Sequence, residues 1–114
     1  MTVVYGIKNC DTVKKARKWL DTNNISYVFH DFRVDGINPQ LVEQFTHLAS
    51  WELLLNKRST TFRSLDDDIK NTINEQTFKA LIIEQPTLIK RPVLLTNNTL
   101  HIGFKAPQYQ EIFS

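Results

Sequence analysis

Residues 2–32 read TVVYGIKNCDTVKKARKWLDTNNISYVFHDF, and this stretch decides the fold. Residues 2–5 are mostly β-branched or aromatic, so they predict a strand, which Gly6 closes. Residues 11–22 carry apolar side chains three and four positions apart, which predicts a helix. These side chains are Val13, Ala16 and Leu20. Residues 26–32 predict a second strand, so the opening is expected to form a βαβ unit with parallel strands.

The middle of the chain predicts a run of helices. Asn38 followed by Pro39 suits a helix start, because asparagine caps the free N–H groups and proline is favoured at the first helical position. In a later helix, Ile69 and Ile73 are expected to face inward. We therefore expect a helical insertion at roughly 37–86.

The last third predicts a β-hairpin and a helix. Residues 92–96 and 100–104 read as strands around the turn Asn97-Asn98, and Ala106-Pro107 opens a short helix. The order of βαβ, several helices and ββα predicts an α/β (α+β) chain with a mixed four-stranded sheet. It resembles a thioredoxin-like fold whose βαβ and ββα halves are separated by a helical insertion, all within a single domain over 1–114.

The composition indicates which classes of protein this chain can belong to. Hydrophobic residues make up 41% of the chain and charged residues 23%, which is typical of a globular domain. No apolar run approaches the ~20 residues of a membrane helix, so no membrane contact is expected. The first residues show no signal peptide, and we expect a cytoplasmic protein. A formal net charge of +2 is too small to predict nucleic-acid binding, and a monomer is the default expectation.

Cys10 is the only cysteine, so an internal disulfide is impossible. Its separations from the three histidines match no usual zinc site, and no metal is expected. A buried inert thiol and a reactive thiol both remain open. The place of Cys10, where a loop meets a predicted helix, favours the reactive thiol, because free N–H groups and the helix dipole stabilise a thiolate.

The neighbours of Cys10 suit a thiolate. Lys8 supplies positive charge, and the amide of Asn9 or the hydroxyl of Thr12 could donate a hydrogen bond to sulfur. Asp11 opposes a thiolate unless it points away to cap the helix. For the lysines and the arginine that follow, up to residue 18, a solvated helix face is the favoured interpretation.

Arg91 and Pro92 directly precede the third predicted strand. A proline there often serves as an edge or entry residue, and a surface salt bridge is the alternative role for the arginine. Arg91 is also a permanently charged donor with a planar fork, which is suited to binding an oxyanion or a carboxylate.

The whole chain resembles the arsenate-reductase (ArsC) family, which includes Spx-type regulators, and most closely its YffB subgroup. The segments that carry the resemblance are residues 5–12, 14–16, 27–36, 54–56 with Trp51, 58–63, 89–92 and 103–104. The resemblance implies a thioredoxin-like fold in which Cys10 is the nucleophile. It also implies that Pro92 follows a cis peptide bond, which places the backbone of Arg91 beside the thiol.

In function, the resemblance implies a glutathione-dependent reductase acting on a thiol-linked or oxyanion substrate. Glutathione would be a co-substrate rather than a bound cofactor, and glutaredoxin a further partner. An alternative from a different class is an Spx-like regulatory protein that binds RNA polymerase or another protein.

The chain departs from the family pattern at the implied anion site. Arsenate reductases hold the oxyanion with three arginines, of which only Arg91 matches directly. Asn56 stands at the second position, with Arg58 as a nearby substitute, and Lys105 or Phe104 lies near the third. Val13 stands where these enzymes have serine and where Spx-type regulators have a second cysteine, so an internal disulfide switch is not expected.

Overall fold

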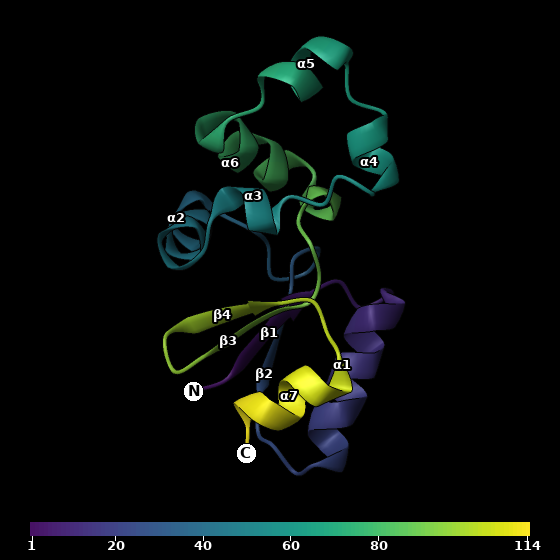
Figure 1. Ribbon diagram of the computed structural model, residues 1–114, viewed down its shortest axis with the longest axis vertical. Helices are drawn as coiled ribbons and strands as arrows, with labels where there is room; N and C mark the ends of the chain where they lie inside the picture. Colours follow the sequence, from purple (N-terminus) through teal and green to yellow (C-terminus); the bar gives the residue numbers. More distant parts are fainter. The chain divides into compact units, whose positions relative to one another are not determined.

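The computed structural model describes residues 1–114, whose contacts fall into two compact units. The first unit comprises Met1–Asp35 and Arg91–Ser114, and the second comprises Gly36–Lys90. The predicted insertion at 37–86 lies wholly within the second unit. Figure 1 shows the strands of the first unit and the helices of both.

The first unit is built on a four-stranded sheet in the order β2-β1-β3-β4 (Figure 1). Strands β1 (Val3–Gly6) and β2 (Val28–Asp31) are parallel. Strands β3 (Val93–Thr96) and β4 (Thr99–Ile102) pair antiparallel with each other, and β3 is also antiparallel to β1. The predicted mixed four-stranded sheet is confirmed.

Helices α1 (Asp11–Thr22) and α7 (Ala106–Ile112) lie beside this sheet (Figure 1). They cover one face, because Val4 and Leu94, which are paired across β1 and β3, join both helices in a single buried cluster. The helical members of this cluster are Ala16, Leu20 and Tyr109. The predicted helix over 11–22 is confirmed, since its apolar stripe is the part that the sheet buries.

The turn of the hairpin follows the prediction. Asn97 and Asn98 have φ angles of 51° and 58°, the left-handed conformation that a two-residue turn between twisted strands requires. Asparagine accepts this conformation more readily than most residues. Strand β2 is shorter than the predicted 26–32, because its first ladder bond, from the N–H of Val28 to the carbonyl of Thr2, forms only at residue 28.

The second unit is helical. Its elements are α2 (Pro39–Leu48), α3 (Trp51–Leu54), α4 (Thr60–Arg63), α5 (Asp67–Thr72), α6 (Glu75–Glu84) and the 3-10 helix η1 (Pro86–Leu88). The predicted start of α2 is confirmed, since the side-chain oxygen of Asn38 accepts the N–H of Leu41 at 2.9 Å. The inward orientation predicted for Ile69 is wrong: this residue is 38% exposed, and α5 buries no residue at all.

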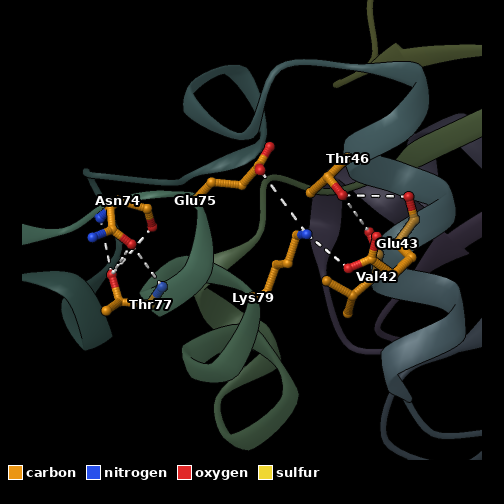
Figure 2. A network of polar contacts seen from close by, with 7 residues as sticks. All are labelled: Val42, Glu43, Thr46, Asn74, Glu75, Thr77 and Lys79. Carbon is orange, nitrogen blue, oxygen red and sulfur yellow. Dashed lines mark hydrogen bonds and ion pairs between the residues drawn. The ribbon is translucent and has the colours of Figure 1, made fainter.

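Helices α2 and α6 pack against each other, and charged side chains join them (Figure 2). Lys79 Nζ lies 2.7 Å from Glu43 Oε1 and 4.0 Å from Glu75 Oε2. The hydrogen bond to Glu43 is the main reason why the pKa of Lys79 is raised. At the start of α6, Asn74 and Thr77 each accept the backbone N–H of the other, which is a capping box (Figure 2).

The last residues of the second unit pair with the segment at the end of α3. Leu55 and Ile89 form an antiparallel bridge, and the N–H of Lys90 donates to the carbonyl of Leu54 at 2.8 Å. Among all the helices of the protein, none has both the length and the apolar character needed to cross a bilayer.

Candidate functional site

Cys10 is the N-cap residue of α1 and is partly exposed to solvent. Its N–H donates to the carbonyl of Ile7 at 3.2 Å, and its carbonyl accepts the N–H of Lys14 at 3.0 Å. These two bonds close the turn after β1 and start the helix. The sulfur therefore stands at the positive end of a twelve-residue helix, although it accepts no hydrogen bond from the N–H groups there.

The sheet register brings Arg91 and Pro92 to the same edge as the cysteine loop. Tyr5 on β1 is opposite Val93 on β3, and the strands are antiparallel. Continuing this register places Pro92 opposite Gly6 and Arg91 beside the start of the cysteine loop. Neighbouring strands lie about 4.8 Å apart, so the segment that precedes β3 and the segment that follows β1 lie side by side at the same end of the sheet.

The peptide bond between Arg91 and Pro92 is cis. Pro92 is buried, and its carbonyl accepts the N–H of Gly103 at 2.8 Å. Gly103 has a φ of 81°, which favours glycine, and this turn directs the chain from β4 toward Lys105, the N-cap of α7. Lys105 therefore follows the end of β4 that pairs with the start of β3, the strand that Arg91 precedes.

The other predicted site residues occupy two different units. Lys8, Asn9 and Thr12 surround Cys10 in the first unit, with exposed side chains. Thr12 is in the first turn of α1, and its hydroxyl makes no hydrogen bond to the sulfur. Arg58 belongs to the second unit, where its N–H donates to Asn56 Oδ1 and its side chain is exposed.

Arg17 of α1 packs against other side chains of the protein instead of pointing into solvent. The guanidinium carbon of Arg17 lies 4.0 Å from the centre of the Phe29 ring, and its Nε donates to the hydroxyl of Tyr27 at 3.2 Å. Arg17 thus ties the helix to β2 and to the residue that precedes it. The exposed cations of this segment are Lys8, Lys14, Lys15 and Lys18.

The sequence analysis missed Asp31, the last residue of β2. Its carboxylate is buried and accepts the backbone N–H of Lys8, two residues before Cys10. A signal was present: an acid at the end of a strand predicted to run parallel to the first must lie at the edge where the cysteine loop begins. No three of the His, Cys, Asp and Glu side chains come together as metal ligands would.

Comparison with known proteins agrees with this architecture. A family model described as the ArsC family matches residues 5–112. An uncharacterized protein of Haemophilus influenzae is 48% identical over 114 residues, which is all of both chains. The solved structure of a YffB protein superposes with a TM-score of 0.93 at 39% identity and covers all of both chains. The global transcriptional regulator Spx 2 of Bacillus anthracis is 34% identical over 110 residues, covering 91% of this chain and 80% of the regulator.

Proposed function

Because the chain belongs to the ArsC family and has the thioredoxin-like fold of that family, we propose that it is a thiol reductase with Cys10 as nucleophile and glutathione as co-substrate. The observation that carries this proposal is the position of Cys10. It is partly exposed at the N-terminus of α1, at the sheet edge that also presents Arg91. A thiolate is stabilised at such a helix end and is the reactive form of cysteine.

The proposed reaction is an exchange of disulfides in two steps. The Cys10 thiolate attacks a mixed disulfide between glutathione and a substrate thiol, forms a Cys10–glutathione disulfide, and releases the substrate as a thiolate, which takes up a proton. A second glutathione thiolate then attacks the glutathione sulfur of the adduct. This releases oxidised glutathione and restores the Cys10 thiolate. An external thiol is required because the chain has no second cysteine.

Arg91 is proposed to bind a carboxylate of glutathione. An arginine binds carboxylates through two parallel N–H groups, and its charge does not depend on pH in the physiological range. Lys105, in the same unit as Arg91, is proposed as a further contact to the anion. Lys8, Asn9 and Thr12 are proposed to favour the thiolate through charge and hydrogen bonds once the ligand is bound. We place the reaction in the cytoplasm, where glutathione keeps thiols reduced.

The test is direct detection of the adduct. Purified protein is mixed with oxidised glutathione, and in a separate arm with arsenate and reduced glutathione, and intact mass is followed with time. We expect one glutathione adduct that maps to Cys10, that disappears on addition of reduced glutathione, and that is absent in Cys10→Ser. A Cys10 that forms the adduct no faster than a short cysteine peptide would contradict the proposed activation of the thiol.

A second function is favoured by the likeness to a transcriptional regulator at 34% identity. In this alternative the protein docks on RNA polymerase or on another protein, and Cys10 is dispensable for docking. Affinity capture from a bacterial lysate with wild type and Cys10→Ser separates the two functions. Equal recovery of polymerase by both proteins, together with no glutathione turnover, would favour docking over catalysis.

A further inference from the structure

Asp31 is a buried carboxylate held by backbone groups. It is only 7% exposed, at the end of β2. Its Oδ2 accepts the N–H of Lys8 at 3.3 Å, and its Oδ1 accepts the N–H of Arg33 at 2.8 Å. A buried carboxylate is costly unless its oxygens are hydrogen-bonded, and here each oxygen has a backbone donor.

The bond to Lys8 continues the ladder between β1 and β2 beyond its last backbone pair. The ladder runs from the N–H of Val28 to the carbonyl of Thr2, and it ends with the N–H of Phe32 bonded to the carbonyl of Gly6, both at 2.9 Å. The next donor of the β1 chain in this alternation is the N–H of Lys8. It bonds to the Asp31 side chain, so a carboxylate takes over where backbone pairing stops.

This bond holds the middle of the turn that carries the cysteine. The turn spans Ile7 to Cys10 and is closed by the N–H of Cys10 on the carbonyl of Ile7. Lys8 is its second residue. The bond from the Lys8 N–H to the Asp31 carboxylate joins this turn to a different strand, β2.

The backbone of Asp31 is itself fixed, which orients its carboxylate. Its N–H donates to Asp35 Oδ2 at 2.9 Å, and its carbonyl accepts the N–H of Val34 at 3.1 Å and the N–H of Asp35 at 2.7 Å. These bonds form a tight turn over residues 31–35. The bond from the N–H of Arg33 to Oδ1 restrains the side chain as well, so it loses little further freedom when Oδ2 binds the cysteine loop.

We propose that Asp31 is a positioning residue for Cys10: its carboxylate holds the Lys8 amide and thereby sets the position of the sulfur at the N-terminus of α1. The functional consequence rests on the proposed role of Cys10 as nucleophile. The hydrogen bond and its effect on the thiol can be measured without glutathione. A displacement of a reacting group by about 1 Å can slow a reaction by about a hundredfold, so a single orienting bond has a measurable effect.

The sign of the effect separates positioning from simple electrostatics. Removing a negative charge near Cys10 would by itself favour the thiolate and accelerate its reaction. Loss of the bond to Lys8 would release the turn and slow the reaction. Asp31→Asn removes the charge and leaves one acceptor oxygen for two N–H donors, whereas Asp31→Ala removes both acceptors. Asp35→Asn is the matched control, because it removes a charge from the same turn and keeps an oxygen for the N–H of Asp31.

Two measurements are made on wild type and the three variants. Hydrogen exchange measured by NMR gives the protection of the Lys8 amide. The Phe32 amide is the internal reference, because its bond to the Gly6 carbonyl does not involve a side chain. The rate at which iodoacetamide alkylates Cys10 at neutral pH reports the reactivity of the thiol. In Asp31→Asn and Asp31→Ala we expect faster exchange at Lys8, unchanged protection at Phe32, and alkylation slower by on the order of tenfold. In Asp35→Asn we expect rates within about twofold of wild type.

The proposal is overturned if alkylation is unchanged or faster in Asp31→Asn while that variant keeps the Phe32 amide protected. Should Asp31→Ala fail to fold, Asp31→Asn decides the question, since it keeps the shape of the side chain. Slower alkylation in this variant, in a protein whose wild type forms no glutathione adduct, would retain the positioning role and refute the proposed function. If the wild type forms the adduct normally and alkylation is unchanged in Asp31→Asn, the proposed function is retained and the positioning role is refuted.

Discussion

A Cβ atom on Gly6 would lie 2.7 Å from Cγ2 of Val13, closer than any side chain tolerates. Gly6 is the last residue of β1, and Val13 is fully buried in the first turn of α1. The end of the strand and the first turn of the helix are thus in contact through the Val13 side chain, which packs directly on the Gly6 backbone. This contact places the N-terminus of α1, and therefore Cys10, close to the sheet edge.

Gly6→Ala is expected to destabilise the protein by about 1–3 kcal/mol, because the added methyl group overpacks a stiff β-branched neighbour. Val13→Ala alone is expected to lose a similar amount through the cavity that it creates. Because the two changes compensate in volume, the double variant should be more stable than the sum of the single effects predicts. Urea unfolding of the four proteins gives the coupling energy, and strictly additive effects would contradict the close contact.

Tyr109 provides a prediction of increased stability. Its side chain is fully buried, its hydroxyl has no hydrogen-bond partner, and burial raises its pKa far above the ordinary value. An unsatisfied buried donor costs about 1–3 kcal/mol, so Tyr109→Phe is expected to raise the free energy of unfolding by about 1 kcal/mol. Tyr27→Phe is the matched control: it removes the acceptor of Arg17 Nε and is expected to lower stability. Urea midpoints that fall in both variants would refute the prediction.

His101 is expected to contribute to the pH dependence of stability. It lies on β4 opposite Leu94, and burial lowers its pKa below the ordinary 6.5. As the pH falls through 6.5, the unfolded chain takes up a proton at this residue before the folded protein does, so folding becomes less favourable. The stability contributed by the neutral imidazole is therefore present above pH 6.5 and lost below it.

His101→Gln should accordingly lose less unfolding free energy than wild type between about pH 7 and pH 5. Urea unfolding at several pH values measures the difference between the two proteins, in which the contributions of the carboxylates cancel. His47→Gln is the control, since His47 is an exposed histidine in the last turn of α2. Parallel stability curves for wild type and His101→Gln would exclude the effect.

Arg91→Ala is expected to weaken binding of glutathione substrates by about ten- to a hundredfold, the range for loss of a hydrogen-bonded charge pair. The rate of alkylation of Cys10 by a neutral reagent should change far less. Arg91→Lys keeps the charge and loses the planar fork, so its KM should lie between those of wild type and Arg91→Ala.

The control for charge is Arg63→Ala, which removes an exposed arginine of α4. Steady-state kinetics with a glutathione mixed disulfide measure KM and kcat for each variant. The same increase in KM in Arg63→Ala and Arg91→Ala would indicate a general effect of net charge and would contradict a specific anion contact at Arg91.

Local pattern predicts much of this molecule. The helix over 11–22, the start of α2 at Asn38 and the hairpin around Asn97 and Asn98 are confirmed, since a few neighbouring residues determine each of them. The errors have a local cause as well. Spacing alone predicts that Ile69 faces inward, but α5 has only six residues, too few for a periodic pattern to establish which side is covered.

The sequence alone determined that Cys10 starts a helix after a strand, because strand, turn and helix propensities act over a few residues. Only the tertiary structure decided what surrounds that cysteine. Arg91 reaches its edge of the sheet through the antiparallel register of β1 and β3, and Asp31 reaches the Lys8 amide through the parallel register of β1 and β2. Such registers depend on pairing between segments far apart in the chain, and a slip of one residue would turn every side chain to the opposite face.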